Sequence, residues 1–165
     1  MSKSQPHQPR KLDSLFARHG QAFFSSLGRL WHQPLANLMT IAVIGENATK
    51  SMTIGGGSSE LKADNEISPL DGVRKHFANA TILHAAGYSS DDKKDKSQLK
   101  KDALSIAKKA DVVLFFGGLN KNISQDCEGA DRQHYHLPYN QDDLIQEISK
   151  VNKNTTVVLI SGNAV

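Results

Sequence analysis

Apolar residues recur with two different spacings from Ile41 onward and predict alternating strands and helices. Continuous apolar runs predict strands that are covered on both faces, and they occur at 41–44, 81–83, 112–116 and 156–160. Apolar residues spaced three and four apart predict helices, at 70–77, 97–110 and 141–151. Strands that alternate with helices in this way predict a mostly parallel sheet between helix layers, which is a three-layer α/β sandwich.

The chain divides into two parts of different character, 1–40 and 41–165. The first part opens with a polar, basic tail and continues with apolar residues at roughly helical spacing between Leu12 and Trp31. Two interpretations fit this leader: an ordinary helix packed on the domain, or a basic amphipathic helix on a membrane surface. The apolar run at 35–44 has about half the length of a membrane span, and no secretory signal is convincing. The cellular location therefore stays undetermined.

Composition narrows the function classes only a little. The 165-residue chain carries a formal net charge of +3 and a single cysteine, so no intrachain disulfide can form. The basic run at 93–101 is interleaved with aspartates and lacks aromatic residues. This pattern is typical of a solvated loop and helix face, and it gives no support to nucleic-acid binding.

A long polar segment follows the predicted strand at 112–116 and carries the best candidate for catalysis. Loops after parallel strands are where open α/β sheets bind ligands, and a connection of about twenty residues is long for a compact domain. Glu128 lies two residues after Asp126, whose negative charge favours the protonated form of Glu128. A protonated carboxyl group can act as a general acid. The alternative is a solvent-exposed glutamate in a mobile loop.

Two other patterns have weaker chemical meaning. His134 and His136 lack a third convergent ligand, so we expect no metal and no cofactor. The glycine-rich stretch at 55–59 contains Gly56, Gly57 and Ser58 and permits close approach of a ligand, but it also fits a flexible linker. Its spacing does not match a phosphate-binding loop.

An ordered set of short motifs carries a family resemblance over nearly all of 41–165. The motifs are Ile41-Ala-Val-Ile-Gly45, Gly55-Gly-Gly-Ser-Ser59, Ser68-Pro-Leu-Asp-Gly72, Ala110-Asp-Val-Val113, Gly118-Leu-Asn120, Glu128-Gly-Ala-Asp-Arg132, Leu137-Pro138, Gln141, Leu144-Ile145 and Ser161-Gly162. In this order they resemble the C-terminal α/β sandwich domain of family 3 glycoside hydrolases, the β-glucosidase and β-xylosidase family.

The resemblance implies a retaining mechanism with two carboxyl groups about 5 Å apart. Glu128 matches the acid/base residue, and Asp131 and Arg132 match a pair that braces the loop or contacts substrate. Gly56, Gly57 and Ser58 match a loop near the interface with a separate barrel, which bears the nucleophile. No barrel precedes Ile41, and later strands are lacking, so we expect a truncated domain without activity by itself. A β-glycoside is the expected substrate once a barrel is supplied.

Residues 1–44 carry a different resemblance. The stretch from Phe23 to Met39 resembles the cytoplasmic segment before the first membrane helix of an FtsX-type cell-division permease, which implies a chimera. Two further hypotheses stay open: a non-catalytic α/β module that binds a sugar or partner, and a membrane-associated fragment of a division protein. A sheet edge left uncovered also favours self-association into an oligomer.

Overall fold

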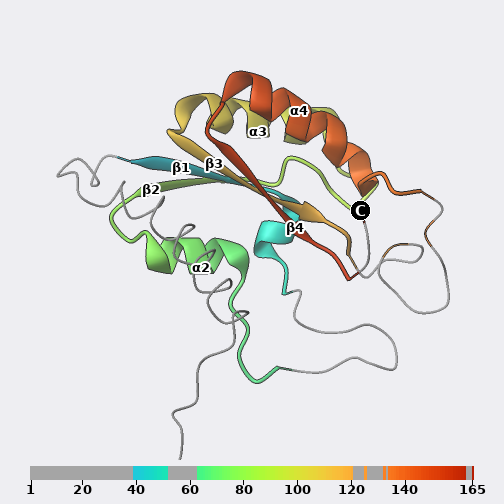
Figure 1. The fold of residues 1–165 in the computed structure, drawn as a ribbon, viewed down its shortest axis with the longest axis horizontal. Coiled ribbons are helices and arrows are strands. Elements are labelled where there is room, and N and C mark those ends of the chain that lie inside the picture. Colours follow the sequence, from blue (N-terminus) through green and yellow to red (C-terminus); the bar gives the residue numbers. More distant parts are fainter. Residues whose placement is uncertain (1–38, 52–62, 121–124, 126–131, 133, 163–164) are drawn as a thin grey trace, which may run out of the picture. The chain divides into compact units, whose positions relative to one another are not determined.

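The structure is a computed structural model that describes residues 39–51, 63–120, 125, 132, 134–162 and 165. Its centre is a parallel sheet of four strands, in the spatial order β2-β1-β3-β4 (Figure 1). The strands are β1 (Thr40–Ile44), β2 (Thr81–Ala85), β3 (Val112–Gly118) and β4 (Thr155–Ile160). The parallel sheet predicted from the apolar runs is therefore confirmed.

Three helices connect the strands and cover the two faces of the sheet. They are α2 (Pro69–His76), α3 (Lys96–Lys109) and α4 (Gln141–Val151). Figure 1 shows α2 on one face and the pair α3 and α4 on the other, which is the expected three-layer arrangement. Two short 3₁₀ helices, η3 (Glu46–Thr49) and η5 (Pro138–Asn140), follow β1 and precede α4.

Local sequence explains where the helices begin. Ser68 caps α2 by accepting a hydrogen bond from the Asp71 N–H at 3.2 Å, and Pro69 occupies the first turn, where no donor is needed. Asp95 caps α3 by accepting from the N–H groups of Ser97 and Gln98. The helix predicted at 70–77 is confirmed to within one residue at each end.

Alternate residues of the two central strands face opposite helix layers. Ala42 and Ile44 of β1 lie in the cluster under α3 and α4, whereas Ile41 and Val43 lie in the cluster over α2. All four are buried. Both faces of β1 are thus fully covered, as the continuous apolar run predicts.

The prediction of a buried strand at 156–160 is wrong for most of β4. Thr156, Val157, Val158 and Leu159 are exposed, because β4 is the last strand of the described sheet and pairs only with β3 within the described ranges. Residues 1–38 of the predicted leader lie outside the described residues, whereas Thr40 is the first residue of β1. None of the described helices has the length and apolar character needed to cross a membrane.

Candidate functional site

The carboxyl ends of the strands form the natural ligand-binding edge of this sheet. The chain runs from β1 to β2 on one side of β1 and then crosses to β3 on the other side. The direction of winding therefore reverses between β1 and β3. Open α/β sheets bind ligands outside the strand ends at such a reversal.

A buried hydrogen-bond network joins the ends of three strands at this edge. The Tyr88 hydroxyl, just after β2, donates to the Phe116 carbonyl of β3 at 3.0 Å and accepts from the Asn47 N–H at 3.2 Å. The Asn47 side chain, just after β1, donates to the Leu119 carbonyl at 3.1 Å. Because every partner is buried, this network fixes the strand ends relative to one another.

Glu46 extends the network to the connection after β2. Its two carboxylate oxygens accept from the Ser90 N–H at 2.6 Å and from the Ser90 hydroxyl at 3.0 Å. Lys50 lies 3.4 Å from the same carboxylate. Both carboxylate oxygens of Glu46 therefore accept hydrogen bonds that hold the loop at Ser90 in place.

Tyr139 anchors the far end of the segment that connects β3 to α4. Its hydroxyl accepts from the Asn120 side-chain amide at 3.1 Å and from the Gln125 side-chain amide at 2.7 Å. The Asn120 N–H in turn donates to the Gln125 side-chain oxygen at 3.1 Å. The start and the end of this connection are thus tied together.

The backbone at Tyr139 is held in an unfavourable conformation. Tyr139 has φ of 61° and Asn140 has φ of 56°, which places two consecutive non-glycine residues in the left-handed region. This conformation costs about 1–2 kcal/mol per residue for L-amino acids. It directs the Tyr139 ring onto the Tyr88 ring, with the ring planes 7° apart and the centroids 6.3 Å apart. Strain of this kind persists where the surrounding contacts require it.

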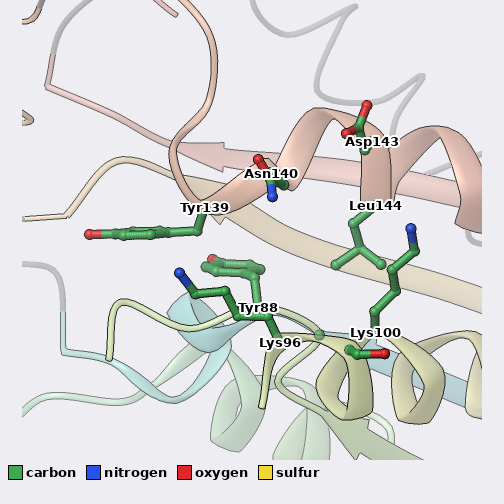
Figure 2. A pocket seen from close by; sticks show the side chains of 9 residues that line it. Tyr88, Lys96, Lys100, Tyr139, Asn140, Asp143 and Leu144 are labelled. Carbon is green, nitrogen blue, oxygen red and sulfur yellow. The ribbon is translucent and has the colours of Figure 1, made fainter. Parts of the chain in front are cut away.

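A pocket of about 320 Å³ opens beside the stacked tyrosines, between the first turns of α3 and α4. Figure 2 shows the Tyr88 and Tyr139 rings parallel and offset from each other, with Lys96 beside Tyr88 and Lys100 and Leu144 further along. The complete lining consists of Gly87, Tyr88, Lys96, Ser97, Lys100, Tyr139, Asn140, Asp143 and Leu144. Aromatic rings and polar groups together suit a small polar ligand.

The charges around this pocket are largely paired. Lys96 lies 2.7 Å from Asp92, and this contact holds the pKa of the Asp92 carboxyl below its ordinary value. Lys100 lies 2.5 Å from Glu147. Burial raises the pKa of the Tyr88 hydroxyl well above its ordinary value, so Tyr88 stays neutral and available as a donor to Phe116.

Most of the residues predicted to act on substrate lie outside the described residues: Gly56, Gly57, Ser58, Glu128 and Asp131. Arg132 is described, and its guanidinium donates to the His136 carbonyl at 3.3 Å. His134 and His136 are exposed. Within the described ranges, no three His, Cys, Asp or Glu side chains converge as metal ligands do.

Sequence reasoning missed the residues that organise this edge. Glu46, Asn47, Tyr88 and Asn120 all follow a strand within three residues of its end. Their position just after a strand could have identified them in the sequence, because polar residues directly after buried parallel strands gather at the carboxyl edge of the sheet. Tyr139 had no such signal.

The family model for the glycosyl hydrolase family 3 C-terminal domain matches residues 33–165. The chain belongs to this family. The match covers the whole described sheet and the network at its carboxyl edge.

Curated relatives and solved structures agree with this assignment. Beta-glucosidase BoGH3A from Bacteroides ovatus is 44% identical over 142 residues, covering 80% of this chain and 19% of the relative. An exo-alpha-(1->6)-L-arabinopyranosidase from Bifidobacterium longum is 35% identical over 132 residues, covering 80% of this chain and 17% of the relative. The crystal structure of a family 3 beta-glucosidase from Bifidobacterium adolescentis superposes with a TM-score of 0.66 at 34% identity, covering 80% of this chain and 19% of that chain. The chain thus spans less than a fifth of the length of these relatives.

Proposed function

We propose that this chain supplies the acid/base half of a retaining β-glycosidase site, with Glu128 as the residue that moves the proton. The observation that carries the proposal is the sequence Glu128-Gly-Ala-Asp-Arg132 in a chain of this family, within the connection between β3 and α4. Both anchors of that connection, Asn120 and Tyr139, lie at the ligand-binding edge of the sheet. We infer that a glutamate within this connection meets the substrate at that edge.

Glu128 acts twice in this proposal. As the carboxylic acid it gives its proton to the glycosidic oxygen while the bond from that oxygen to the anomeric carbon breaks. A second carboxylate bonds to the anomeric carbon at the same time, and the alcohol leaves. The Glu128 carboxylate then takes a proton from water, whose oxygen bonds to the anomeric carbon and releases the sugar and the second carboxylate.

The second carboxylate is proposed to come from a polypeptide region outside these 165 residues. The relatives are more than five times as long as their matched region, which leaves ample chain to carry it. We therefore expect the purified chain to show no turnover of aryl β-glycosides by itself.

Reconstitution tests the proposal. The purified chain is mixed with the Bacteroides ovatus relative from which the matched region has been removed, and hydrolysis of para-nitrophenyl β-glucoside and β-xyloside is measured. We expect activity that requires both components and falls about 100-fold or more in Glu128→Gln. The exposed acid Asp64 provides the control, because Asp64→Asn should leave activity unchanged.

A small-residue variant separates chemistry from structure. Glu128→Gly should lose turnover with the aryl glycoside, and azide should restore it and give a β-glycosyl azide, because azide attacks the anomeric carbon of the covalent intermediate in place of water, releases the second carboxylate and needs no general base. Full activity of Glu128→Gln in the reconstituted enzyme overturns the proposal. Turnover by the chain alone that survives Glu128→Gln also overturns it.

The pocket beside Tyr88 and Tyr139 favours a second candidate, a module that binds sugar without hydrolysis. Its lining combines two aromatic rings with the polar side chains of Ser97, Asn140 and Asp143. Thermal stabilisation of the chain by glucose or xylose, lost in Asp143→Ala and retained in Glu128→Gln, is the result this candidate predicts. Equal stabilisation in Asp143→Ala and the unaltered chain counts against it.

A further inference from the structure

Gln125 lies three residues before Glu128, and both polar ends of its side-chain amide are held. The amide nitrogen donates to the Tyr139 hydroxyl at 2.7 Å, and the amide oxygen accepts from the Asn120 N–H at 3.1 Å. The Asn120 side-chain amide donates to the same hydroxyl at 3.1 Å. These three residues close a ring of hydrogen bonds, which we call the Gln125 bridge. It joins the start, the interior and the end of the connection between β3 and α4.

The Tyr139 end of the bridge is fixed to the edge of the sheet. Its ring lies parallel to the Tyr88 ring, with the two planes 7° apart (Figure 2). The Tyr88 hydroxyl is itself held between the Asn47 N–H and the Phe116 carbonyl, which are both buried. A continuous series of contacts therefore runs from the strand ends to Gln125.

The strained backbone at Tyr139 also points to the bridge. Tyr139 has φ of 61°, which is an unfavourable conformation for a residue with a large side chain. A relaxed backbone would direct the ring elsewhere and carry the hydroxyl away from Asn120 and Gln125. Strain of this kind is concentrated at functional sites, where the contacts that it permits are part of the mechanism.

The bridge limits how far Glu128 can lie from a fixed point. Three residues of fully extended chain span at most about 10 Å, whereas the eight residues from Asn120 to Glu128 span up to about 28 Å. Holding Gln125 therefore cuts the range open to Glu128 to roughly a third. A general acid must lie within hydrogen-bond reach of the oxygen that it protonates, so this restriction bears directly on the rate.

We propose that Gln125 and Tyr139 are positioning residues for Glu128, an inference that rests on the proposed function. Gln125, bonded to the Tyr139 hydroxyl, sets where the Glu128 carboxyl group stands relative to the glycosidic oxygen. Both polar ends of the Gln125 amide have partners within the bridge, so this side chain acts by holding the chain and not by contacting the sugar.

Leaving groups of different acidity test the proposal in the reconstituted enzyme. Gln125→Leu and Tyr139→Phe each break the contact between the two side chains. Each should lower kcat/KM for phenyl β-glucoside about tenfold, because phenol leaves only with the proton from Glu128. The value for 2,4-dinitrophenyl β-glucoside should fall less than about twofold, because that leaving group departs without a proton. A merely structural role would lower both values equally.

A double variant and two controls complete the kinetic test. Gln125→Leu combined with Tyr139→Phe should stay within about threefold of either single variant, because both substitutions break the same bridge. Tyr135→Phe and Gln146→Leu make the same changes at exposed positions and should leave both kinetic values unaltered. Circular dichroism verifies that each variant is folded.

A spin label at Cys127 tests the bridge in the full chain without a partner. Cys127 is the only cysteine, so a nitroxide reagent attaches at a single position between Gln125 and Glu128. The rotational correlation time of the label should shorten at least about twofold in Gln125→Leu and in Tyr139→Phe, because the chain on its N-terminal side is released. It should not change in Tyr135→Phe.

The outcomes separate this inference from the proposed function. Full activity of Glu128→Gln overturns both. If Glu128→Gln loses activity while Gln125→Leu and Tyr139→Phe keep it, only the positioning role is overturned. Equal losses with both leaving groups, or unchanged motion of the label, also overturn that role alone. If the mixture shows no turnover, the label decides: unchanged motion overturns the bridge, and shortened correlation times support it.

Discussion

The Gln141 side chain closes a pair of hydrogen bonds with the backbone of Gly118. Its amide nitrogen donates to the Gly118 carbonyl at 2.9 Å, and its amide oxygen accepts from the Gly118 N–H at 2.9 Å. Gln141 is 0% exposed although it is a polar residue at the first turn of α4. It thereby gives hydrogen-bond partners to the N–H and C=O of Gly118, the last residue of β3, and fixes where α4 begins relative to the sheet.

Gln141→Ala should lower the free energy of unfolding by about 2–4 kcal/mol, because the substitution leaves a buried N–H and a buried carbonyl without partners. Urea unfolding followed by circular dichroism measures the change. Gln146→Ala removes the same side chain from an exposed position of the same helix and should change stability by less than about 0.5 kcal/mol. Equal effects of the two substitutions would show that the Gly118 contact contributes little.

Gly45 and Gly72 should respond in opposite ways to alanine. Gly45 has φ of +132°, and a Cβ there would lie 1.9 Å from the Phe116 carbonyl oxygen, so Gly45→Ala should destabilise by about 3 kcal/mol or more. Gly72 lies inside α2, where a Cβ would meet only Ile67 at 3.9 Å. Gly72→Ala should stabilise by up to about 1 kcal/mol, because alanine favours the helix. Thermal unfolding of the two variants measures both signs.

Tyr88 should make stability fall at alkaline pH. Burial raises the pKa of its hydroxyl above 10.0, so its contribution is fully present below about pH 10 and is lost as the pH rises toward the higher folded-state value. Unfolding free energies at about pH 8 and about pH 11 should show a decline that is smaller in Tyr88→Phe. That variant should also lose about 1–3 kcal/mol at the lower pH, because Asn47 and Phe116 lose a partner. Tyr135→Phe, at a residue 79% exposed, should leave both values unchanged.

The sequence predicted local elements well because their causes are local. The helical spacings at 70–77 and 141–151 depend on residues within a few positions of one another, and the helices that they predict are confirmed. The network was beyond such reasoning, because its hydrogen bonds join Asn47 to residues 41 and 72 positions away. The exposure of β4 was missed for the same reason: an apolar run has the same composition at the edge of a sheet as at its centre.

The candidate site was predicted from motifs rather than from packing. For this reason the family is confirmed while the roles of single residues stay predictions. The family resemblance drawn from short motifs is confirmed by the match over residues 33–165. The roles of Glu128 and Asp131 stay predictions, because these residues lie outside the described part of the chain. The resemblance of residues 1–44 to a division permease likewise stays a prediction.

Tyr139 and Asn140 share an unfavourable backbone conformation but should differ in what that conformation achieves. Both have positive φ, whereas only Tyr139 stacks on Tyr88 and accepts hydrogen bonds from Asn120 and Gln125. Asn140→Gly should be neutral or stabilise by up to about 1 kcal/mol, because glycine adopts this conformation without cost.

Tyr139→Gly relieves the same strain but should still destabilise by about 2 kcal/mol, since the ring contact and its burial are lost. Tyr139→Phe keeps the stack and removes only the hydroxyl, so it should change global stability little while hydrogen exchange at Asn120 accelerates. Urea unfolding and hydrogen exchange measure the two effects separately. If Tyr139→Gly proves as stable as Asn140→Gly, the contacts of the Tyr139 side chain do not stabilise the protein. The proposed anchoring of the connection is then wrong.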